Sequence, residues 1–250
     1  MNVFEKSFLI NDSHTGLNRI CKMSAIINFI QYATVSHILC NEDKQETMEL
    51  YAKVGMFLTN VRIKLNRPLF YGEVIKVKTY QCPLTSSKIY RICKLYVEEE
   101  LVGEAVTVAL LVDLQTRKLI NPNMYVDNLK KFIYSGKNEK ISIKKIVRKK
   151  VINTKTYQVE YSDADKNGHM NNVRYAELIS NIINMNEQQD KYISEMQIDF
   201  ISECSVGQEI RLGTEKNDNV FYVQGVDIKN KLKFNGEAHL TAISPSEASN

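Results

Sequence analysis

The chain gives one order of secondary-structure signals twice, and this repeat constrains the fold more than any other feature. A short extended stretch, KSFLIN (6–11), precedes a polar turn, DSHTGLNR (12–19), and then an apolar stretch at helical spacing (22–40). Segments that alternate apolar and polar residues, as half-buried strands do, follow at 57–66, 73–82, 88–99 and 103–114.

The second half repeats this order. KTYQVEYS (155–162) is extended, DADKNGHMNN (163–172) is the polar turn, and VRYAELISNIINM (173–185) has helical spacing. Strand-like segments follow at 195–204, 208–217, 219–228 and 231–243. Gly16 and Gly168 take matching places in the two turns, 152 residues apart (168 − 16). One long helix and a run of antiparallel strands, given twice, predict an α+β fold in which each curved sheet wraps a helix.

Length and composition fit two globular domains, because 250 residues with 44% apolar and 25% charged side chains are ordinary for such proteins. Residues 130–150 carry nine Lys or Arg against one Glu and show little periodicity. We therefore expect domains at 1–129 and 151–250, joined by a basic linker at 130–150. The linker is either a solvated surface or a landing surface for an acidic partner.

Several classes of protein are disfavoured. No apolar run approaches the about 20 residues that span a bilayer, and the N-terminus lacks the apolar segment of a signal peptide. Five cysteines without a CxxC pair argue against zinc and disulfides, and favour a reducing cytoplasm. Without a helix-turn-helix, an RNP motif or a phosphate-binding glycine loop, neither nucleic acid nor a nucleotide cofactor is expected. No metal or organic cofactor is implied.

The second polar turn is the strongest candidate for a functional site. Asp165, Asn167 and His169 occupy alternate positions, which in extended or turning backbone can place them on one side. The N–H groups at the start of the next helix can polarise a carbonyl. Each residue also has a plain structural interpretation: a helix cap or Asx turn for Asp165, an Asn-Gly turn for Asn167, and a structural histidine for His169.

Glu203 and Cys204 lie at the end of the strand predicted at 195–204. Glu203 is either a second carboxylate of the site or a solvent-facing strand end. Cys204 is either a small buried hydrophobe or, with His169 and Asn167, the nucleophile of a papain-like set, and the carboxylate interpretation is preferred.

These motifs together resemble those of the acyl-ACP thioesterases, which release fatty acids from acyl carrier protein. DADKNGHMNNVRY (163–175) is similar to the family signature D-x-D-x-N-x-H-x-N-N-x-[KR]-Y. Three further segments match family motifs in the same order: RPLFYGEVIKVKTY (67–80), LLVDLQTRKL (110–119) and IDFISEC (198–204). The chain departs from the family in having no tryptophan and in Phe200, where tyrosine is usual. Both changes bear on packing and chain-length preference more than on the chemistry.

The resemblance implies tandem hot-dog domains and hydrolysis of fatty acyl-[acyl carrier protein], with water activated by a set of four residues: Asp165, Asn167, His169 and Glu203. It implies acyl carrier protein as partner, and either a monomer or a homodimer. An acyl-CoA thioesterase and a non-catalytic acyl-thioester binder remain as alternatives. We expect the basic linker to meet the acidic carrier protein through Lys144, Lys145, Arg148, Lys149 and Lys150.

The first half is expected to be catalytically inactive, because its turn places Ser13, Thr15 and Leu17 opposite Asp165, Asn167 and His169. The resemblance implies that its long helix lines the acyl tunnel, where the candidate chain-length residues are Met23, Ile26, Ile27 and Ile30. Plain core packing is the alternative for these four side chains.

Overall fold

The structure is a computed structural model that describes residues 2–40, 45, 49, 52–135 and 143–244. Its first half consists of a long helix, α1 (Met23–Leu39), and five long strands: β1 (Phe4–Leu9), β2 (Val54–Leu65), β3 (Val74–Gln81), β4 (Ile89–Val97) and β5 (Glu100–Asp113). The second half consists of α4 (Asn172–Ile182) and five strands: β7 (Ile152–Gln158), β8 (Lys191–Phe200), β9 (Glu209–Asn217), β10 (Val220–Val226) and β11 (Leu232–Ala242). The predicted order of long elements is confirmed in both halves.

Short elements that the sequence patterns do not predict connect the long ones. They are β6 (Leu119–Ile120), α3 (Val126–Leu129), α5 (Met185–Gln188) and four 3-10 turns, η1 (Asp12–His14), η2 (Pro122–Tyr125), η3 (Lys130–Phe132) and η4 (Tyr161–Asp163). Each spans two to four residues, which is too short for an apolar period to be recognised in the sequence.

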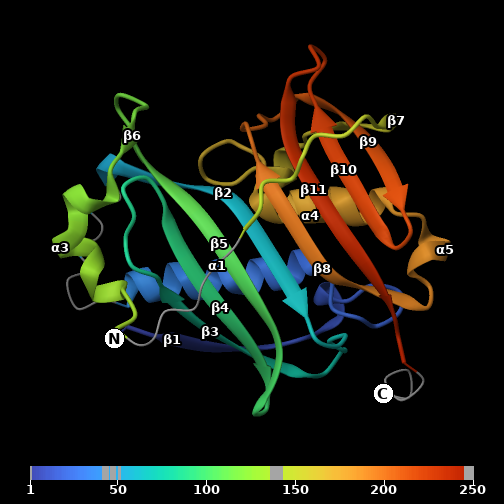
Figure 1. The fold of residues 1–250 in the computed structure, drawn as a ribbon, viewed down its shortest axis with the longest axis horizontal. Helices are drawn as coiled ribbons and strands as arrows, with labels where there is room; N and C mark the ends of the chain where they lie inside the picture. Colours follow the sequence, from blue (N-terminus) through green and yellow to red (C-terminus); the bar gives the residue numbers. More distant parts are fainter. Residues whose placement is uncertain (1, 41–44, 46–48, 50–51, 136–142, 245–250) are drawn as a thin grey trace.

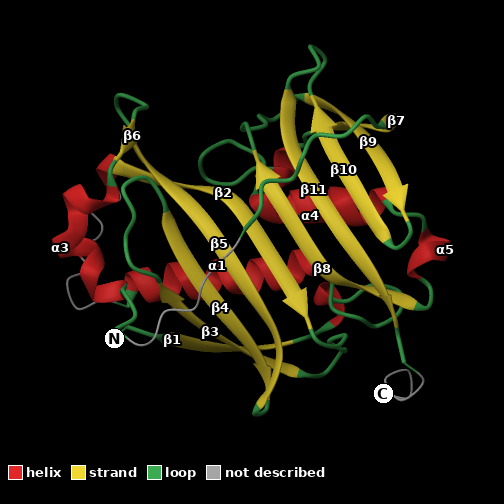
Figure 2. Cartoon of the chain, in the orientation of Figure 1, coloured by secondary structure: helices red, strands yellow, loops and turns green. Residues whose placement is uncertain are grey.

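The described strands form one antiparallel sheet of 11 strands in the order β1-β3-β4-β5-β2-β8-β11-β10-β9-β7, with β6 beside β5. The order from the edge of the sheet to its middle is β1-β3-β4-β5-β2 in the first half and β7-β9-β10-β11-β8 in the second. The two orders are equivalent, because β7 to β11 follow one another in the second half as β1 to β5 do in the first. The halves join where β2 pairs with β8, with Asn60 opposite Asp199 and Ile63 opposite Met196. Both long helices lie on one face of the curved sheet (Figures 1 and 2). The α+β prediction of a helix wrapped by a curved antiparallel sheet in each half is confirmed, and the pairing of β2 with β8 joins the two predicted sheets into one.

The core lies between the two helices and the sheet and runs across both halves. Ile26 and Ile30 of α1, Ile179 of α4 and Phe234 of β11 belong to one cluster, each at most 1% exposed. Burying a side chain of this size stabilises the fold by about 1.5–3 kcal/mol. Gly236 of β11 allows α4 to pack closely on the sheet, since a Cβ at this position would overlap the Ile179 side chain of α4. None of the described helices is both long and apolar enough to cross a membrane.

The connection between the halves is described only in part, because residues 136–142 of the predicted linker lie outside the described residues. The part of the connection after this gap, residues 143–151, crosses the sheet on the face opposite the helices (Figure 1). The backbone of this part is fastened to β8, since Lys144 O accepts a hydrogen bond from Gln197 Nε2 (2.6 Å) and Ile146 N donates one to Asp199 Oδ2 (2.8 Å). Lys144, Lys145, Arg148 and Lys150 are exposed, whereas Lys149 Nζ lies 5.5 Å from the centre of the Tyr222 ring.

Candidate active site

The turn before α4 is built by its own hydrogen bonds. Asp165 Oδ1 accepts from Asn167 N (2.8 Å), and Asp165 N donates to His169 O (2.9 Å). Gly168 closes the turn at φ +77°, a conformation that glycine adopts without steric cost. Asn171 then caps α4, because its Oδ1 accepts from Val173 N (3.0 Å). The capping role considered for Asp165 therefore falls to Asn171, and Asp165 forms an Asx turn instead.

The buried carboxylate of Asp163 holds this turn in place. Asp163 is 1% exposed, and its carboxylate accepts hydrogen bonds from Tyr157 Oη (2.6 Å), Glu160 N (2.8 Å) and Arg174 Nε (2.7 Å). Burial by itself would raise the pKa of Asp163, but these bonds and the Arg174 charge together lower it. Asp163 thus joins the end of β7, the turn and the first turn of α4.

The loop after β8 supplies the second part of the site. The strand predicted at 195–204 ends at Phe200, so Glu203 lies three residues beyond it in a loop. The strand stops there because Ile201 N and Ser202 N both donate to the same acceptor, Lys233 O (2.9 and 3.0 Å). Lys233 Nζ donates to Glu203 O (2.8 Å), and Cys204 O accepts from Met170 N (2.8 Å). The loop is therefore tied to both β11 and the polar turn.

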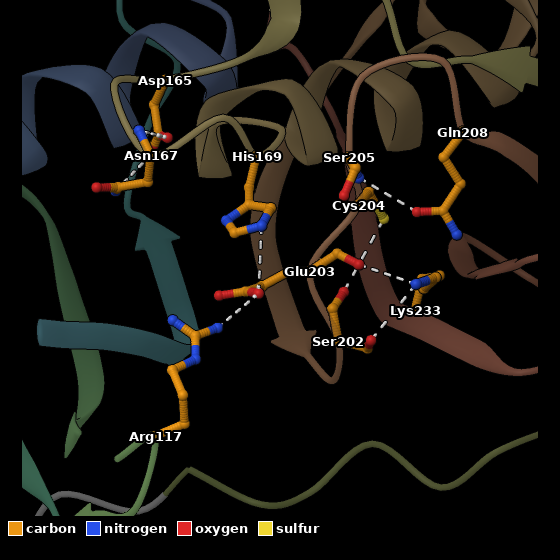
Figure 3. A network of polar contacts seen from close by, with 10 residues as sticks. All are labelled: Arg117, Asp165, Asn167, His169, Ser202, Glu203, Cys204, Ser205, Gln208 and Lys233. Carbon is orange, nitrogen blue, oxygen red and sulfur yellow. Dashed lines mark hydrogen bonds and ion pairs between the residues drawn. The ribbon is translucent and has the colours of Figure 1, made fainter. Parts of the chain in front are cut away.

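Glu203 lies between a histidine and an arginine. Its Oε2 is 3.4 Å from His169 Nε2 and 3.2 Å from Arg117 Nη2 (Figure 3). The His169 and Glu203 side chains are 30% and 37% exposed, so solvent reaches both. A carboxylate beside an imidazole can orient the ring, and general acid–base catalysis needs an oriented imidazole.

Asp165 and Asn167 form a second pair within the turn. Asn167 Nδ2 donates to Asp165 Oδ2 (3.3 Å) in addition to the backbone bond described above. In Figure 3 this pair lies to one side of His169 and Glu203. Among the described residues no hydrogen bond or ion pair joins the side chains of the two pairs, which are linked only by the backbone bond from Asp165 N to His169 O. The structure therefore places the four predicted residues in one region, as two adjoining pairs.

Cys204 is inside the protein and 0% exposed. Burial raises the pKa of its thiol, although the Tyr175 hydroxyl and the Lys233 charge oppose the shift. The thiolate is the nucleophilic form of cysteine, so a raised pKa argues against the papain-like alternative. His169 in addition faces Glu203 in this structure.

The two polar turns correspond at an offset of 149 residues, not 152. Asp12–His14 matches Tyr161–Asp163 (161 − 12), and the start of α1 at Met23 matches the start of α4 at Asn172. The residue with positive φ is Arg19 (61°) in the first turn and Gly168 (77°) in the second. Matching glycine to glycine was therefore wrong, because the first turn takes its left-handed conformation at an arginine.

This offset changes the comparison between the halves. The residues opposite Asp165, Asn167 and His169 are Gly16, Asn18 and Ile20, in place of the predicted Ser13, Thr15 and Leu17. The Cys21 N to Leu69 O bond (2.7 Å) matches that of Met170 N to Cys204 O, which places Pro68 opposite Glu203. The first half has no titratable side chain at any of these positions, and its expected inactivity stays a prediction.

The four candidate tunnel residues face the core. Met23, Ile26, Ile27 and Ile30 are 0–3% exposed and belong to the cluster between α1 and the sheet. Both a tunnel wall and plain core packing are compatible with this placement, so the tunnel stays a prediction. Among the described residues no three His, Cys, Asp or Glu side chains are grouped as a metal would require.

Three side chains of the site were missed from the sequence. Arg117 lies within the motif segment 110–119, so the sequence does contain a signal for it. The order of the motifs along the chain does not indicate that Arg117 lies close to Glu203 in space. Tyr175, whose raised pKa reflects burial and the neighbouring Cys204, closes the 163–175 signature. Lys233 has no signal, because one lysine in an alternating strand is ordinary.

Comparison with known protein families gives matches in both halves of the chain. The sequence matches the acyl-ACP thioesterase N-terminal domain over residues 1–126 and the acyl-ACP thioesterase C-terminal domain over residues 146–244. No match is found among curated protein sequences.

Solved structures with the same fold cover nearly the whole chain. A crystal structure of an acyl-ACP thioesterase from Bacteroides thetaiotaomicron is 20% identical, covers 96% of this chain and 98% of that one, and has a TM-score of 0.81. The 12:0-ACP thioesterase from Umbellularia californica is 16% identical, covers 97% and 98%, and has a TM-score of 0.83. These likenesses show the double hot-dog fold, and the two domain matches, which together span most of the sequence, show that the chain belongs to the acyl-ACP thioesterase family.

Proposed function

We propose that this chain hydrolyses the thioester of fatty acyl-[acyl carrier protein] at the site formed by the second polar turn and the loop after β8. The single observation that carries the proposal is the contact between His169 and Glu203, 3.4 Å apart beside the Asp165–Asn167 turn at the start of α4. This set occurs in a chain of the acyl-ACP thioesterase family, and the matching positions of the first half lack it.

In the proposed reaction the Asp165 carboxylate takes a proton from water as the water oxygen bonds to the thioester carbon. Asn167 positions this water or the carbonyl, because its amide is already oriented by Asp165. The positive end of the α4 dipole stabilises the oxyanion. When the C–S bond breaks, His169, held by Glu203, gives its own proton to the leaving sulfur. After the products leave, Asp165 loses the proton that it took from water to solvent, and His169 regains one from solvent.

The partner and the acyl site are part of the same proposal. The acyl chain lies along α1, against Met23, Ile26, Ile27 and Ile30, whose side chains are apolar and buried. The acidic carrier protein docks on the basic segment of the connection, where Lys144, Lys145, Arg148 and Lys150 are exposed. Opposite charges at such a surface speed up encounter more than they tighten the complex.

The test is release of free fatty acid from a panel of acyl carrier proteins by the purified chain. We expect Asn167→Ala to lower kcat by about 100-fold, in the range for losing one positioned donor. Asn18→Ala is the matched control, because Asn18 holds the same place in the first turn, where its Oδ1 accepts a hydrogen bond from Ile20 N (3.2 Å). The control is expected to keep full activity.

Two results would favour the alternatives. If the wild-type chain bound acyl carrier protein and released nothing, it would be a non-catalytic acyl-thioester binder. If it hydrolysed acyl-CoA as fast as acyl-[acyl carrier protein], without dependence on salt, the acyl-CoA alternative would replace the proposed substrate.

A further inference from the structure

The geometry points to Arg117, a residue of the first half, as a positioning residue for Glu203 in the second half. Arg117 Nη2 lies 3.2 Å from Glu203 Oε2, the same oxygen that faces His169 Nε2 at 3.4 Å. Figure 3 shows Glu203 between these two side chains, which reach it from different directions. The inference rests on the proposed function, because it concerns how Glu203 is held for the role assigned to it there.

The backbone of Arg117 is fixed by a tight turn after β5. Asp113 Oδ1 accepts hydrogen bonds from Gln115 N (3.0 Å) and Thr116 N (2.6 Å), and Asp113 O accepts one from Arg117 N (2.8 Å). Arg117 itself has φ +58°, a left-handed conformation that side chains other than glycine seldom adopt. Backbone strain of this kind is kept where the surroundings determine it strongly, and such places are often functional. The turn therefore gives the side chain a defined starting direction.

The guanidinium group is also supported on its way to Glu203. Arg117 Cζ lies 5.6 Å from the centre of the Phe57 ring of β2, within the range of a cation–π contact. A planar guanidinium that rests on an aromatic ring loses little further freedom when it binds a carboxylate. Arg117 follows β5 in the chain and its guanidinium contacts Phe57 of β2, so two neighbouring strands of the first half position this cation beside the second half.

The energetic contribution of the Arg117–Glu203 pair to folding is small, since the two side chains are 57% and 37% exposed and water screens their attraction. Its effect is instead on geometry. Glu203 lies in a loop, where Lys233 holds its carbonyl group but leaves the side chain free to rotate. Arg117 restricts the carboxylate to the side of His169, and a misplaced reacting group is costly in rate. The second half therefore supplies the acid–base residues, and the first half orients one of them.

The experiment compares Arg117→Met with Arg62→Met. Arg62 of β2 is the matched control, because it also forms an ion pair across the two halves, with Glu195 of β8 (Nε to Oε1, 2.8 Å), away from His169. Both variants are assayed with acyl-pantetheine, so that docking of the carrier protein plays no part. We expect Arg117→Met to lower kcat about tenfold with KM unchanged, and Arg62→Met to leave both constants unchanged. Thermal midpoints are expected to be equal for the two variants.

Chemical rescue separates positioning from packing. Arg117→Ala is expected to recover part of its lost kcat in dilute guanidinium chloride, compared with equal sodium chloride, since the free cation can occupy the place of the guanidinium group. Arg117→Lys is expected to lie between wild type and Arg117→Met. Rescue together with the split between kcat and KM supports the inference.

Three outcomes overturn it. Equal kcat values for Arg117→Met and Arg62→Met remove the role of Arg117, and the proposed function then still stands if His169→Ala and Glu203→Gln are inactive. A loss that neither guanidinium nor Arg117→Lys relieves assigns the effect to packing against Phe57. A wild-type chain that releases no fatty acid from any thioester overturns the proposed function, and this inference with it.

Discussion

Asn60 and Asp199 are joined across the seam between the two halves, with Asn60 Nδ2 2.7 Å from Asp199 Oδ1. The same carboxylate accepts bonds from Gln197 Nε2 (2.9 Å) and from Ile146 N of the connection (2.8 Å). Asp199 is only 1% exposed. One buried side chain therefore holds together β2 of the first half, β8 of the second half, and the connection between the halves.

We expect Asp199→Ala to lower the free energy of unfolding by about 3 kcal/mol, because it leaves three donors without their acceptor. Glu195→Gln is the control, since its ion pair with Arg62 crosses the same seam with side chains 21% and 38% exposed, and we expect a loss below about 1 kcal/mol. Urea unfolding followed by circular dichroism measures both. Equal losses would contradict the special role of the buried carboxylate.

The Asp163 cluster predicts a dependence of stability on pH. Because the folded state lowers the pKa of Asp163, its contribution is present above the unfolded pKa of about 3.9 and is lost as the pH falls through the lower folded value. Asp163→Asn should lower the free energy of unfolding at neutral pH by about 2 kcal/mol and flatten its decline below about pH 4. Urea midpoints measured from neutral pH to about pH 3 test this.

Asp218→Asn serves as the reference for that series, since Asp218 is exposed at the turn between β9 and β10. It should leave both the neutral stability and the acid decline as in the wild type. A decline that stays equally steep in Asp163→Asn would place the acid sensitivity at other carboxylates.

Cys204 is predicted to be dispensable for the chemistry. Because burial raises the pKa of its thiol, we expect Cys204→Ala to keep kcat within about threefold, at a cost of about 1 kcal/mol in stability. Labelling with iodoacetamide should modify the exposed Cys40 and leave Cys204 unmodified in the folded protein. An acyl-enzyme trapped on Cys204, with kcat lost in Cys204→Ala, would restore the nucleophile interpretation.

The basic segment is predicted to act on encounter with the carrier protein and not on hydrolysis. Reversing Lys144, Lys145 and Lys150 to Glu should raise KM for acyl-[acyl carrier protein] about tenfold at low salt and leave acyl-pantetheine hydrolysis unchanged. Lys149 is left in place, because its side chain packs on Tyr222. Reversal of three exposed lysines of the first half, Lys6, Lys53 and Lys88, is the control for net charge. Equal effects on both substrates would exclude docking at this segment.

The long elements were predictable because each carries its own periodic signal. α1 and the strands after it are long enough for their apolar spacing to be recognised in the sequence, although in α1 Val35 is exposed and His37 is buried. The end of β8 was not predictable, because ISEC continues a strand-like pattern while Lys233 takes the N–H groups of Ile201 and Ser202. Lys233 lies in a strand 31 to 32 residues further on (233 − 202 and 233 − 201), so this partner leaves no local sign in the sequence.

The site was predictable in its residue types but not in its pairing. Alternate spacing suggested that Asp165, Asn167 and His169 act as one group, whereas the Asx turn pairs the first two and leaves His169 to Glu203. The correspondence between the halves failed for a related reason. Glycine is the usual sign of a left-handed residue, and the first half uses Arg19 for it.

The pairing of β2 with β8 takes place within one polypeptide. If two separate chains made the same seam, the fraction assembled would fall on dilution, and with it any site that needs both sides. The covalent connection removes that dependence, because the pairing of the two sides becomes intramolecular. The enzyme should therefore show the same specific activity at the lowest concentrations a cell contains as it does at the highest.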